Sequence, residues 1–359
     1  MEGLHKFACY PKFSLSKYRA LKHFFSNFGY AWSARYEELT KAGFDEISAH
    51  EFLEWRDTFR EEEYEHILVD DAIKIISIED TAYPPLLKEI FDPPVVLFVR
   101  GILDNSRPRV AVVGTRKMTV YGKHMTEDLV GELVQHGVEV VSGLALGIDG
   151  IAHKASLSAG GTTIGVLGSG VDRKSIYPRA HYELGETIID KKGALIGEYP
   201  PGAVPTTYSF PKRNRIVAGI SLATLVIEAP EKSGALITTS CSLEYGRDVY
   251  AVPHALTSPT GAGPHKLIRD GAYLVRSAED ILENLNLNAF ERHIKVQETI
   301  PDTSDEGQLL VLLSREPLHI DEITRKSTFP GPKVIAMLTV LEMKGKVQNV
   351  GNMMYVVKK

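Results

Sequence analysis

The sequence predicts an α/β fold, in which a doubly wound and mostly parallel sheet follows a small helical domain and precedes a winged helix. Three observations lead to this prediction: helical periodicity near the start, short apolar runs alternating with helical stretches through the middle, and a helix-strand-helix-helix-hairpin order near the end. The 359 residues, 43% of them hydrophobic, are enough to bury at least one full core.

The helical domain is expected to span residues 1–75. Between residues 14 and 71, apolar and aromatic residues recur at helical spacing, and glycines interrupt the pattern. The proline-rich stretch 83–94 then favours extended backbone ahead of the apolar run Val95–Val99. This arrangement suits a linker that leads into an edge strand of the sheet.

The sheet domain is expected to span residues 76–287 and to be Rossmann-like. Its strands are predicted from short apolar runs that alternate with helical stretches, a pattern typical of a parallel sheet covered by helices on both faces. The runs are Val110–Val113, Val138–Val141, Thr163–Leu167, Ala194–Ile196, Ala223–Ile227 and Val249–Val252.

Residues 288–304 have the composition of a linker, and residues 305–359 are predicted to form a winged helix. The expected elements are a helix over 307–313, a strand over 318–320, a helix capped by Asp321, a turn at Gly331-Pro332, a helix over 333–343 and a hairpin around Gly351-Asn352. The last helix exposes little beyond Lys333. DNA reading, protein contact and autoregulation therefore all stay open as roles for this domain.

Charge and cysteine content narrow the function classes. A formal net charge of -5 argues against a uniformly basic coat, so a phosphate-binding surface must be a local patch. Cys9 and Cys241 have neither the spacing nor the neighbouring histidines of a disulfide framework or zinc site, which favours a reducing, cytoplasmic setting. No stretch approaches the ~20 apolar residues of a membrane span. We expect no membrane association, no metal and no cofactor.

The turn after the first long apolar strand indicates a phosphate ligand. Gly114, Thr115 and Arg116 follow the strand directly, and Thr119 opens a helix whose backbone N–H groups face an anion. The turn lacks the small residues of a dinucleotide-binding fingerprint, because Arg116 and Met118 stand in their places. Guanidinium holds phosphate in a fork that lysine cannot form. The alternative is that Arg116 pairs with a neighbouring acid for structure.

The next turn, from Ser142-Gly143, runs into a helix that carries Asp149 and His153 four residues apart. An acid and an imidazole on one helical face invite a catalytic interpretation. No serine or cysteine nucleophile stands beside them, however, so we favour a structural role in which the pair holds the loop at the start of the helix.

Two basic clusters follow, Arg173-Lys174 after the third strand and Lys212-Arg213 beside Phe210 and Asn214. Phosphate neutralisation supplies most of the affinity for single strands, and an aromatic ring can stack on a base for ~1–3 kcal/mol without demanding a sequence. The combination predicts a groove for single-stranded nucleic acid. Against it, basic runs are usually just solvated, and Phe210 next to a proline is often a core or turn anchor.

An enzymatic alternative comes from the Ser233-Gly234 turn, a second helix start suited to an anion. With Glu228 before it and Glu244 on the following helix, the segment is similar to nucleotide-hydrolysing Rossmann relatives such as the phosphoribohydrolases of cytokinin activation. Their Gly-Gly turn is absent, which weakens this nucleotide-binding alternative.

Six motifs in order resemble the DNA-processing protein A (DprA/Smf) family between about residues 83 and 280. They are V-V-G-T-R, S-G-L-A-x-G-I-D-x-x-A-H, Y-P, F-P-x-R-N-R, S-G-A-L-I-T-T and G-A. The flanks are also similar to the family, which often carries a sterile-alpha-motif-like helical domain before the sheet and a winged helix after it. One departure is His254, which follows Val252-Pro253 where the family usually has glycine.

The resemblance implies a protein that is not an enzyme. It implies binding of single-stranded DNA without base preference, protection of the incoming strand, and loading of the RecA recombinase during natural transformation, commonly as a homodimer. Carried over onto this sequence, the strand-binding pocket falls on Gly114, Thr115, Arg116, Arg173, Lys174, Phe210, Lys212, Arg213 and Asn214, with Ser142 and Gly143 shaping its floor.

Overall fold

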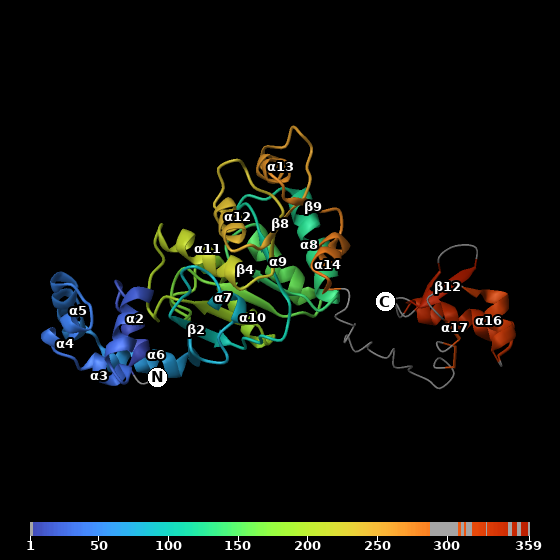
Figure 1. The fold of residues 1–359 in the computed structure, drawn as a ribbon. Coiled ribbons are helices and arrows are strands. Elements are labelled where there is room, and N and C mark those ends of the chain that lie inside the picture. Colours follow the sequence, from blue (N-terminus) through green and yellow to red (C-terminus); the bar gives the residue numbers. More distant parts are fainter. Residues whose placement is uncertain are drawn as a thin grey trace. The chain divides into compact units, whose positions relative to one another are not determined.

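The structure is a computed structural model that describes residues 3–287, 308–309, 312–313, 318–327, 329–343, 347–349 and 353–357. By its internal contacts the chain separates into two compact units, Met1–Glu291 and Arg292–Lys359. Each unit is considered by itself, and Figure 1 names the elements of both. The linker expected over residues 288–304 lies outside the described residues.

The first unit is built on a mostly parallel sheet, as predicted. Its strands are β1 (Ile73–Ser77), β2 (Val96–Gly101), β3 (Arg109–Val113), β4 (Glu139–Ser142), β5 (Thr163–Val166), β6 (Ala194–Gly197), β7 (Ala223–Val226), β8 (Asp248–Ala251) and β9 (Tyr273–Leu274). Their order across the sheet is β1-β2-β6-β5-β4-β3-β7-β8-β9. The pairs β1–β2 and β2–β6 are antiparallel, and the others are parallel. The chain therefore winds outward from β3 in both directions.

The prediction of an edge strand at Val95–Val99 is wrong. The strand formed there, β2, lies inside the sheet between β1 and β6, and its residues Leu97 and Phe98 are fully buried. The edge strand on this side of the sheet is β1, a five-residue strand that follows α6 closely and whose short apolar run gave no separate signal. The domain boundary expected after residue 75 falls inside β1.

Six short helices precede the sheet: α1 (Leu4–Ala8), α2 (Leu15–Phe24), α3 (Phe28–Trp32), α4 (Tyr36–Lys41), α5 (Glu46–Thr58) and α6 (Glu61–Asp70). Side-chain caps fix several of their starts, since Ser14, Asn27 and Asp45 each accept a backbone N–H three residues on. Aromatic rings fill their core, where Phe7 and Phe52 stack at 5.1 Å between centroids. These residues form the predicted helical segment.

Helices cover both faces of the sheet (Figure 1). One face carries α8 (Val120–Gln135), α9 (Ile148–Ser158), α10 (Tyr182–Asp190) and α14 (Ala278–Asn284). The other carries α7 (Pro85–Lys88), α11 (Ser209–Gly219), α12 (Ala235–Glu244) and α13 (Ala262–Arg269). Two short 3-10 helices, Arg179–His181 and Pro259–Gly261, lie in the connecting loops.

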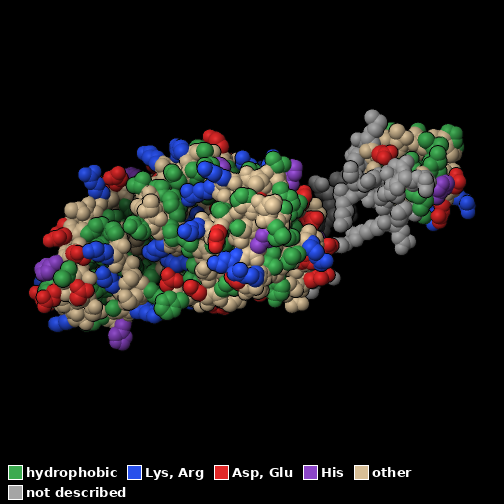
Figure 2. Space-filling view, turned by 90° about the horizontal axis from the view of Figure 1, so that it is seen from above, with side chains coloured by type: hydrophobic (Ala, Val, Ile, Leu, Met, Phe, Trp, Pro, Cys, Tyr) green, Lys and Arg blue, Asp and Glu red, His purple; other side chains and the backbone are tan. Residues whose placement is uncertain are grey.

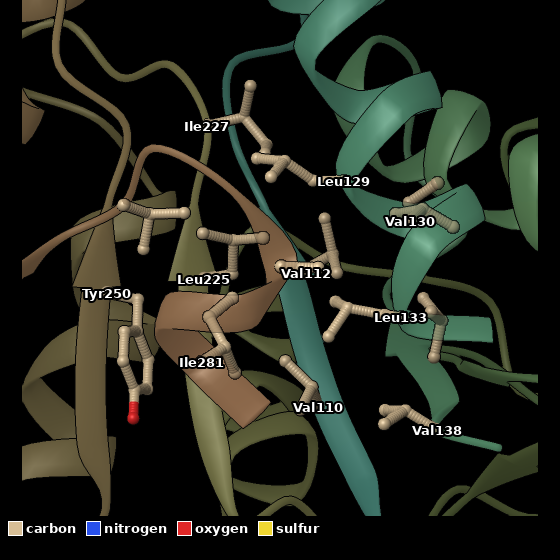
Figure 3. Packing of buried hydrophobic residues seen from close by; sticks show 14 of the residues in the cluster. Val110, Val112, Leu129, Val130, Leu133, Val138, Leu225, Ile227, Tyr250 and Ile281 are labelled. Carbon is tan, nitrogen blue, oxygen red and sulfur yellow. The ribbon is translucent and has the colours of Figure 1, made fainter. Parts of the chain in front are cut away.

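Alternate residues of β3 belong to the two cores. Val110 and Val112 point toward Leu129 and Leu133 of α8, with Ile281 of α14 nearby (Figure 3). All of these side chains are buried, and full burial of each contributes about 1.5–3 kcal/mol. Residues 111 and 113 belong to the cluster on the opposite face. The rigid β3 thus delivers the turn after it to a fixed place.

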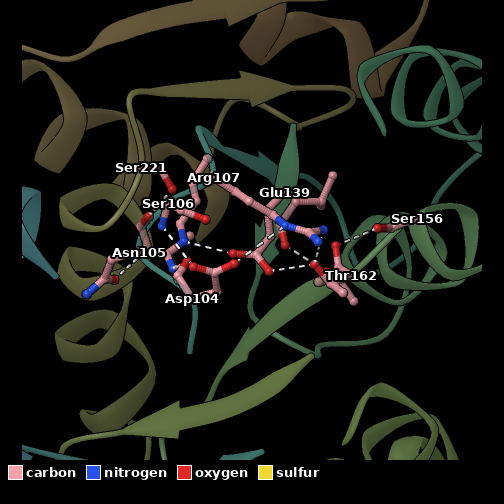
Figure 4. A network of polar contacts seen from close by, with 12 residues as sticks. Asp104, Asn105, Ser106, Arg107, Glu139, Ser156, Thr162 and Ser221 are labelled. Carbon is pink, nitrogen blue, oxygen red and sulfur yellow. Dashed lines mark hydrogen bonds and ion pairs between the residues drawn. The ribbon is translucent and has the colours of Figure 1, made fainter. Parts of the chain in front are cut away.

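The amino edge of the sheet, where β3 and β4 begin, holds a closed polar network (Figure 4). The Arg109 Nε–H donates to Glu139 Oε2 at 2.9 Å, and the side chains of the two residues are 5% and 2% exposed. Thr162 donates to the other carboxylate oxygen at 2.7 Å and accepts from Arg107 at 3.1 Å. Charges here are matched inside the protein.

The second unit has the predicted helix-and-hairpin order in its described residues. They form β10 (Leu318–His319), α16 (Ile320–Lys326), α17 (Gly331–Met343), β11 (Val347–Asn349) and β12 (Met354–Val357), with antiparallel strands in the order β10-β12-β11. The first expected helix is described only at 308–309 and 312–313, and the turn at Gly351-Asn352 lies outside the described residues.

Two details of that prediction are wrong. The cap of α16 is His319, whose Nδ1 accepts the Asp321 N–H at 3.3 Å, because the helix begins one residue before Asp321. Gly331 and Pro332 belong to the first turn of α17 instead of a separate turn, since proline is compatible with a helix start.

Within the described residues, no helix combines the length and apolar character needed to cross a bilayer. The same residues contain no group of three or more His, Cys, Asp or Glu side chains placed to hold a metal ion. Both cysteines are free thiols.

Candidate nucleic-acid interface

The carboxyl edge of the sheet gathers the turns after β3 and β4, the loop after β5 and the start of α11. Open α/β sheets place their ligands at this edge. We call the group of side chains there the carboxyl-edge site: Gly114, Thr115, Arg116, Ser142, Gly143, Tyr177, Phe210 and Arg213. On one face of the molecule, Lys and Arg side chains gather in groups with hydrophobic side chains between them (Figure 2).

The turn after β3 is locked by its neighbours. The Thr115 N–H donates to Glu228 O at 2.7 Å, and the Ile148 N–H donates to Thr115 O at 3.2 Å. Gly147 has φ +79°, and a Cβ there would lie 2.2 Å from Thr115 O. Only glycine fits such a close approach in this conformation. Arg116 therefore projects from a fixed backbone.

Arg116 is exposed, and its positive charge has no carboxylate partner among the described residues. Its guanidinium carbon lies 5.5 Å from the ring centroid of Phe210, a cation–π contact. Among the described residues it forms no hydrogen bond or ion pair with a carboxylate. The alternative that Arg116 pairs with a neighbouring acid is therefore not what the described residues show.

The turn after β4 is held from below by side chains of its own helix. Ser142 Oγ donates to Val112 O at 2.6 Å, and Asp149 accepts the Gly143 N–H at 3.1 Å. The Leu144 N–H donates to His153 Nε2 at 3.3 Å. Asp149 and His153 thus bind loop backbone, as the structural interpretation of this pair predicted.

His153 is a neutral, fully buried histidine. Its Nδ1–H donates to Thr163 Oγ1 at 2.8 Å, and the Thr163 hydroxyl donates to Val140 O. Burial lowers the pKa of His153 to about 3, and nearby His181 and Arg213 act in the same direction. With both ring nitrogens engaged and no proton to exchange near pH 7, the imidazole is unsuited to general acid–base work.

Arg213 lies beneath the surface and not on it, although the sequence suggested an exposed basic cluster. It is 5% exposed, and its guanidinium donates to Val166 O. The group occupies the space beside Gly143, where a Cβ would lie 2.4 Å from both terminal nitrogens. Burial lowers the pKa of Arg213 to about 10, Asp149 raises it and Arg116 lowers it. The two arginines therefore share one site.

The other residues expected from α11 have separate environments. Phe210 is half-buried beside Gly168, and its ring lies 5.7 Å from that of Tyr177. Lys212 points outward and pairs with Glu198 at 2.5 Å. The Asn214 side-chain amide donates to Gly234 O at 3.2 Å.

The two basic residues Arg173 and Lys174 differ in whether a carboxylate binds them. Arg173 is bound by Asp71 Oδ1 at 2.9 Å and by Glu186 Oε2 at 3.3 Å, so it ties the loop after β5 to the residue that follows α6. Lys174 is exposed, and no ion pair of it appears in the described part of the chain. Of this pair, only Lys174 has a charge that is not matched by a bound carboxylate.

Glu228 occupies the anion position that the sequence analysis assigned to a ligand. Its Oε2 accepts the Thr119 N–H at 2.8 Å, and its Oε1 accepts the hydroxyls of Thr119 at 2.6 Å and Thr260 at 3.0 Å. A Cβ on Gly122 would lie 2.2 Å from Oε2, so the carboxylate sits directly on the start of α8. The α8 N-terminus is therefore neutralised by the chain itself.

A pocket of about 390 Å³ lies beside Glu228 and is lined by Thr119, Tyr121, Glu228, Pro253, His254, Ala255 and Ser258. The imidazole of His254, the departure noted above, approaches Glu228 Oε1 at 3.5 Å and donates from Nδ1 to Val252 O. This loop therefore closes over the carboxylate.

Sequence reasoning missed one residue of the carboxyl-edge site, Tyr177, and the roles of two residues that support it, Gly147 and Glu228. Tyr177 was recognised only as part of a Y-P motif, Gly147 only as a small residue, and Glu228 as a candidate catalytic group. Their roles depend on which loops meet in space. One signal in the sequence could have pointed to Tyr177: an aromatic residue three positions after Lys174, in the same polar loop.

Comparisons with known proteins agree with this geometry. The model of the family "DNA recombination-mediator protein A" matches residues 74–286, and that of the "DprA winged helix domain" matches residues 295–352. Protein Smf of Escherichia coli is 38% identical over 278 residues, which cover 76% of this chain and 74% of that protein. DNA processing protein DprA of Bacillus subtilis is 45% identical over 219 residues, covering 60% and 72%.

Two solved structures share the fold. DprA from Streptococcus pneumoniae superimposes with a TM-score of 0.66 at 33% identity, covering 78% of this chain and 96% of that one. DNA processing protein A from Helicobacter pylori, whose structure gives insights into its single-stranded DNA binding mode, has a TM-score of 0.53 at 28% identity, covering 60% and 95%. The Rossmann-like sheet and the C-terminal winged helix are thereby confirmed.

Proposed function

Because the chain belongs to the DNA recombination-mediator protein A family, we propose that it binds single-stranded DNA without base preference at the carboxyl-edge site. In this proposal it protects the strand and loads the RecA recombinase onto it, as a homodimer and without catalysing a reaction. The name of the family and the strand binding of the Helicobacter pylori relative support the proposal.

One observation is central to the proposal: two arginines share a site in which neither forms an ion pair with a carboxylate among the described residues. Burial is the main cause that lowers the pKa of Arg213, Asp149 raises it and Arg116 lowers it, so the positive charge of Arg116 opposes that of Arg213. A phosphate bound by Arg116 offsets that repulsion, and its binding releases counterions from the strand. Arg213 has the carboxylate of Asp149 in its surroundings, whereas Arg116 has no carboxylate partner among the described residues, so the unmatched charge of the pair is that of the exposed Arg116.

The roles of the individual residues follow from their exposure. Arg116, Lys174 and Lys212 contact phosphates from the surface, Lys212 by leaving Glu198, while Arg213 adds charge from below. The remaining proposed pocket residues, Gly114, Thr115, Ser142, Gly143, Phe210 and Asn214, shape the surface that the strand follows. Arg173 contacts the strand only if a phosphate replaces its carboxylate partners, Asp71 and Glu186.

The domain organisation also stays a proposal. We retain the helical, sheet and winged-helix domains with a linker over residues 288–304, and we move the first boundary to the start of β1 because that strand is part of the sheet. The winged helix is proposed to serve partner contacts or DNA reading.

Neither glutamate of the phosphoribohydrolase-like alternative offers a free carboxylate at the carboxyl-edge site. Glu228 is fully buried and accepts three hydrogen bonds within the protein, and Glu244 ends α12 at the far side of the sheet from the carboxyl-edge site. The start of α12 is also occupied, since Ser233 Oγ accepts the Ala235 N–H. Release of free base from nucleoside monophosphates by the pure protein is the result that would reinstate this alternative.

The test is a titration of the protein into fluorescent poly-dT at two salt concentrations. We expect binding that weakens steeply with salt, and we expect Arg116→Ala to weaken binding to every sequence about equally and to reduce the salt slope by about 0.7, one phosphate of a single strand. Arg213→Lys should weaken it too, because the fork is lost.

The matched control is Arg107→Ala, which removes an arginine from the amino edge of the same sheet. It should leave both affinity and salt slope unchanged. Salt-independent binding by the natural protein, or unchanged binding in both Arg116→Ala and Arg213→Lys, contradicts the proposal.

A further inference from the structure

We propose that the ring of Tyr177 is the platform on which a base of the bound strand stacks, and that Phe210 braces it. This inference rests on the proposed function, since it concerns the same site. It assigns the stacking role to a residue other than Phe210, the aromatic that the sequence suggested for it.

Phe210 already has neighbours on several sides. Its side chain is half-buried, and its Cδ1 lies where a Cβ on Gly168 would be only 3.2 Å away. The Arg116 guanidinium lies over the ring at 5.5 Å, and the Tyr177 ring is 5.7 Å away at a tilt of 43°. A base would have to displace one of these groups to stack on Phe210.

Tyr177 is available where Phe210 is not. Its side chain is 47% exposed in the loop after β5, and Phe210 is its ring neighbour among the described residues. An exposed ring held against a second ring loses little freedom when a base stacks on it, which favours binding. Stacking on an aromatic face is tolerant of sequence, because every base has a π-face.

The charges around Tyr177 fit a strand that passes over it. Arg116 contacts the same Phe210 ring, and Lys174 lies three residues before Tyr177 in the same loop. A phosphate held by Arg116 therefore leaves a neighbouring base within reach of Tyr177. Phe210 links the cation that holds the backbone to the ring that receives the base.

Tyr208 provides a matched comparison, because it is the N-cap residue of α11, the helix that carries Phe210. It is 85% exposed and stands two residues before Phe210, but it has no ring neighbour among the described residues. If any exposed tyrosine near the site could stack on a base, Tyr177 and Tyr208 would contribute alike. If bracing by Phe210 matters, only Tyr177 contributes.

The experiment compares two oligonucleotides of equal length, oligo-dT and the same backbone with abasic sites. Tyr177→Ala is expected to weaken oligo-dT binding by about 5- to 150-fold, the loss of one stacked base, and to leave abasic binding unchanged. Tyr177→Phe should keep the natural affinity, whereas Tyr177→Leu should behave like Tyr177→Ala because it offers no π-face. Tyr208→Ala should change neither.

The outcomes separate this inference from the proposed function. Equal losses on both oligonucleotides, or an unchanged dT affinity in Tyr177→Ala, overturn the stacking role while Arg116→Ala still weakens both. Equal effects of Tyr177→Ala and Tyr208→Ala also overturn it. Failure of the natural protein to bind either oligonucleotide overturns the proposed function itself.

Discussion

At the amino edge of the sheet Arg109 is enclosed by hydrogen-bond acceptors, whereas at the carboxyl edge Arg116 has none in the part of the chain that the structure describes. The three nitrogens of Arg109 donate to Glu139, Asn105 and the backbone carbonyl of Asp104. Among the described residues, the Arg116 guanidinium contacts the ring of Phe210, and its charged neighbour is a second arginine. The same side chain is thus a cross-link at one edge and an unmatched charge at the other.

The difference shows how one sheet separates stability from binding. Buried ion pairs lose much of their attraction to desolvation, but removing one partner is costly because a buried charge is left alone. An exposed arginine can be removed at little cost to the fold. We therefore expect substitutions at the amino edge to change the free energy of unfolding, and those at the carboxyl edge to change DNA affinity.

The largest effect is expected for Glu139→Gln. It leaves the charge of Arg109 buried without its partner, so the free energy of unfolding in urea should fall by about 3–5 kcal/mol. Replacing both residues with apolar ones of similar size should recover most of this loss. A loss below about 1 kcal/mol in the single variant would show that the pair is dispensable.

Gly147→Ala tests the backbone that carries Arg116. A side chain at φ +79° with its Cβ 2.2 Å from Thr115 O should cost on the order of 3 kcal/mol and also weaken DNA binding by displacing the turn. Gly160→Ala is the control, because Gly160 has φ +80° but no atom within 4 Å of the added Cβ. It should cost only about 1 kcal/mol and leave binding alone.

His153 predicts a pH dependence. Its pKa is about 3 in the folded protein and about 6.5 when unfolded, so between these values only the unfolded chain takes up a proton. Stability should therefore fall as the pH drops below 6.5, by about 2 kcal/mol at pH 5. Urea unfolding at pH 7 and pH 5 should show this loss in the natural protein and in the exposed-site control His124→Gln, but not in His153→Gln. Equal losses in all three proteins would refute it.

The smallest effect is expected at the divided basic cluster. Arg173 is half-exposed, so Arg173→Ala should lower stability by only about 0.5–1 kcal/mol through its contacts with Asp71 and Glu186. Lys174→Ala should leave stability unchanged and reduce the salt slope of DNA binding instead. A larger loss of DNA affinity in Arg173→Ala than in Lys174→Ala would show that phosphate does replace the carboxylates.

The strands of the parallel sheet were predictable because each is an uninterrupted apolar run buried on both faces. All six predicted runs became strands, with ends shifted by no more than one residue. The antiparallel edge formed by β1 and β2 was not predictable, because β1 is a short run and tertiary packing decides which strand it pairs with. Sequence order also placed Arg116 at a ligand-binding edge, since the carboxyl ends of parallel strands share one side.

The depth of each side chain could not be read from the sequence. Lys212 and Arg213 are adjacent, yet one is exposed and the other is buried against Gly143, because α11 turns them to different sides. Nor could the sequence reveal that Glu228, more than a hundred positions after Thr119, binds the start of α8. Such pairings depend on β3 and β7 being neighbours in the sheet.

The carboxylate of Glu228 on the start of α8 has a consequence for selectivity in a crowded cell. An open helix start at this place in the fold would bind the phosphate of a free nucleotide as readily as that of a strand. Because the carboxylate of Glu228 already accepts the hydrogen bonds of Thr119 at the start of α8, these donors are not available to the phosphate of a mononucleotide. The cations that stay unmatched among the described residues of the proposed site, Arg116 and Lys174, lie outside this helix start, and a polymer with linked phosphates can engage more than one of them at once.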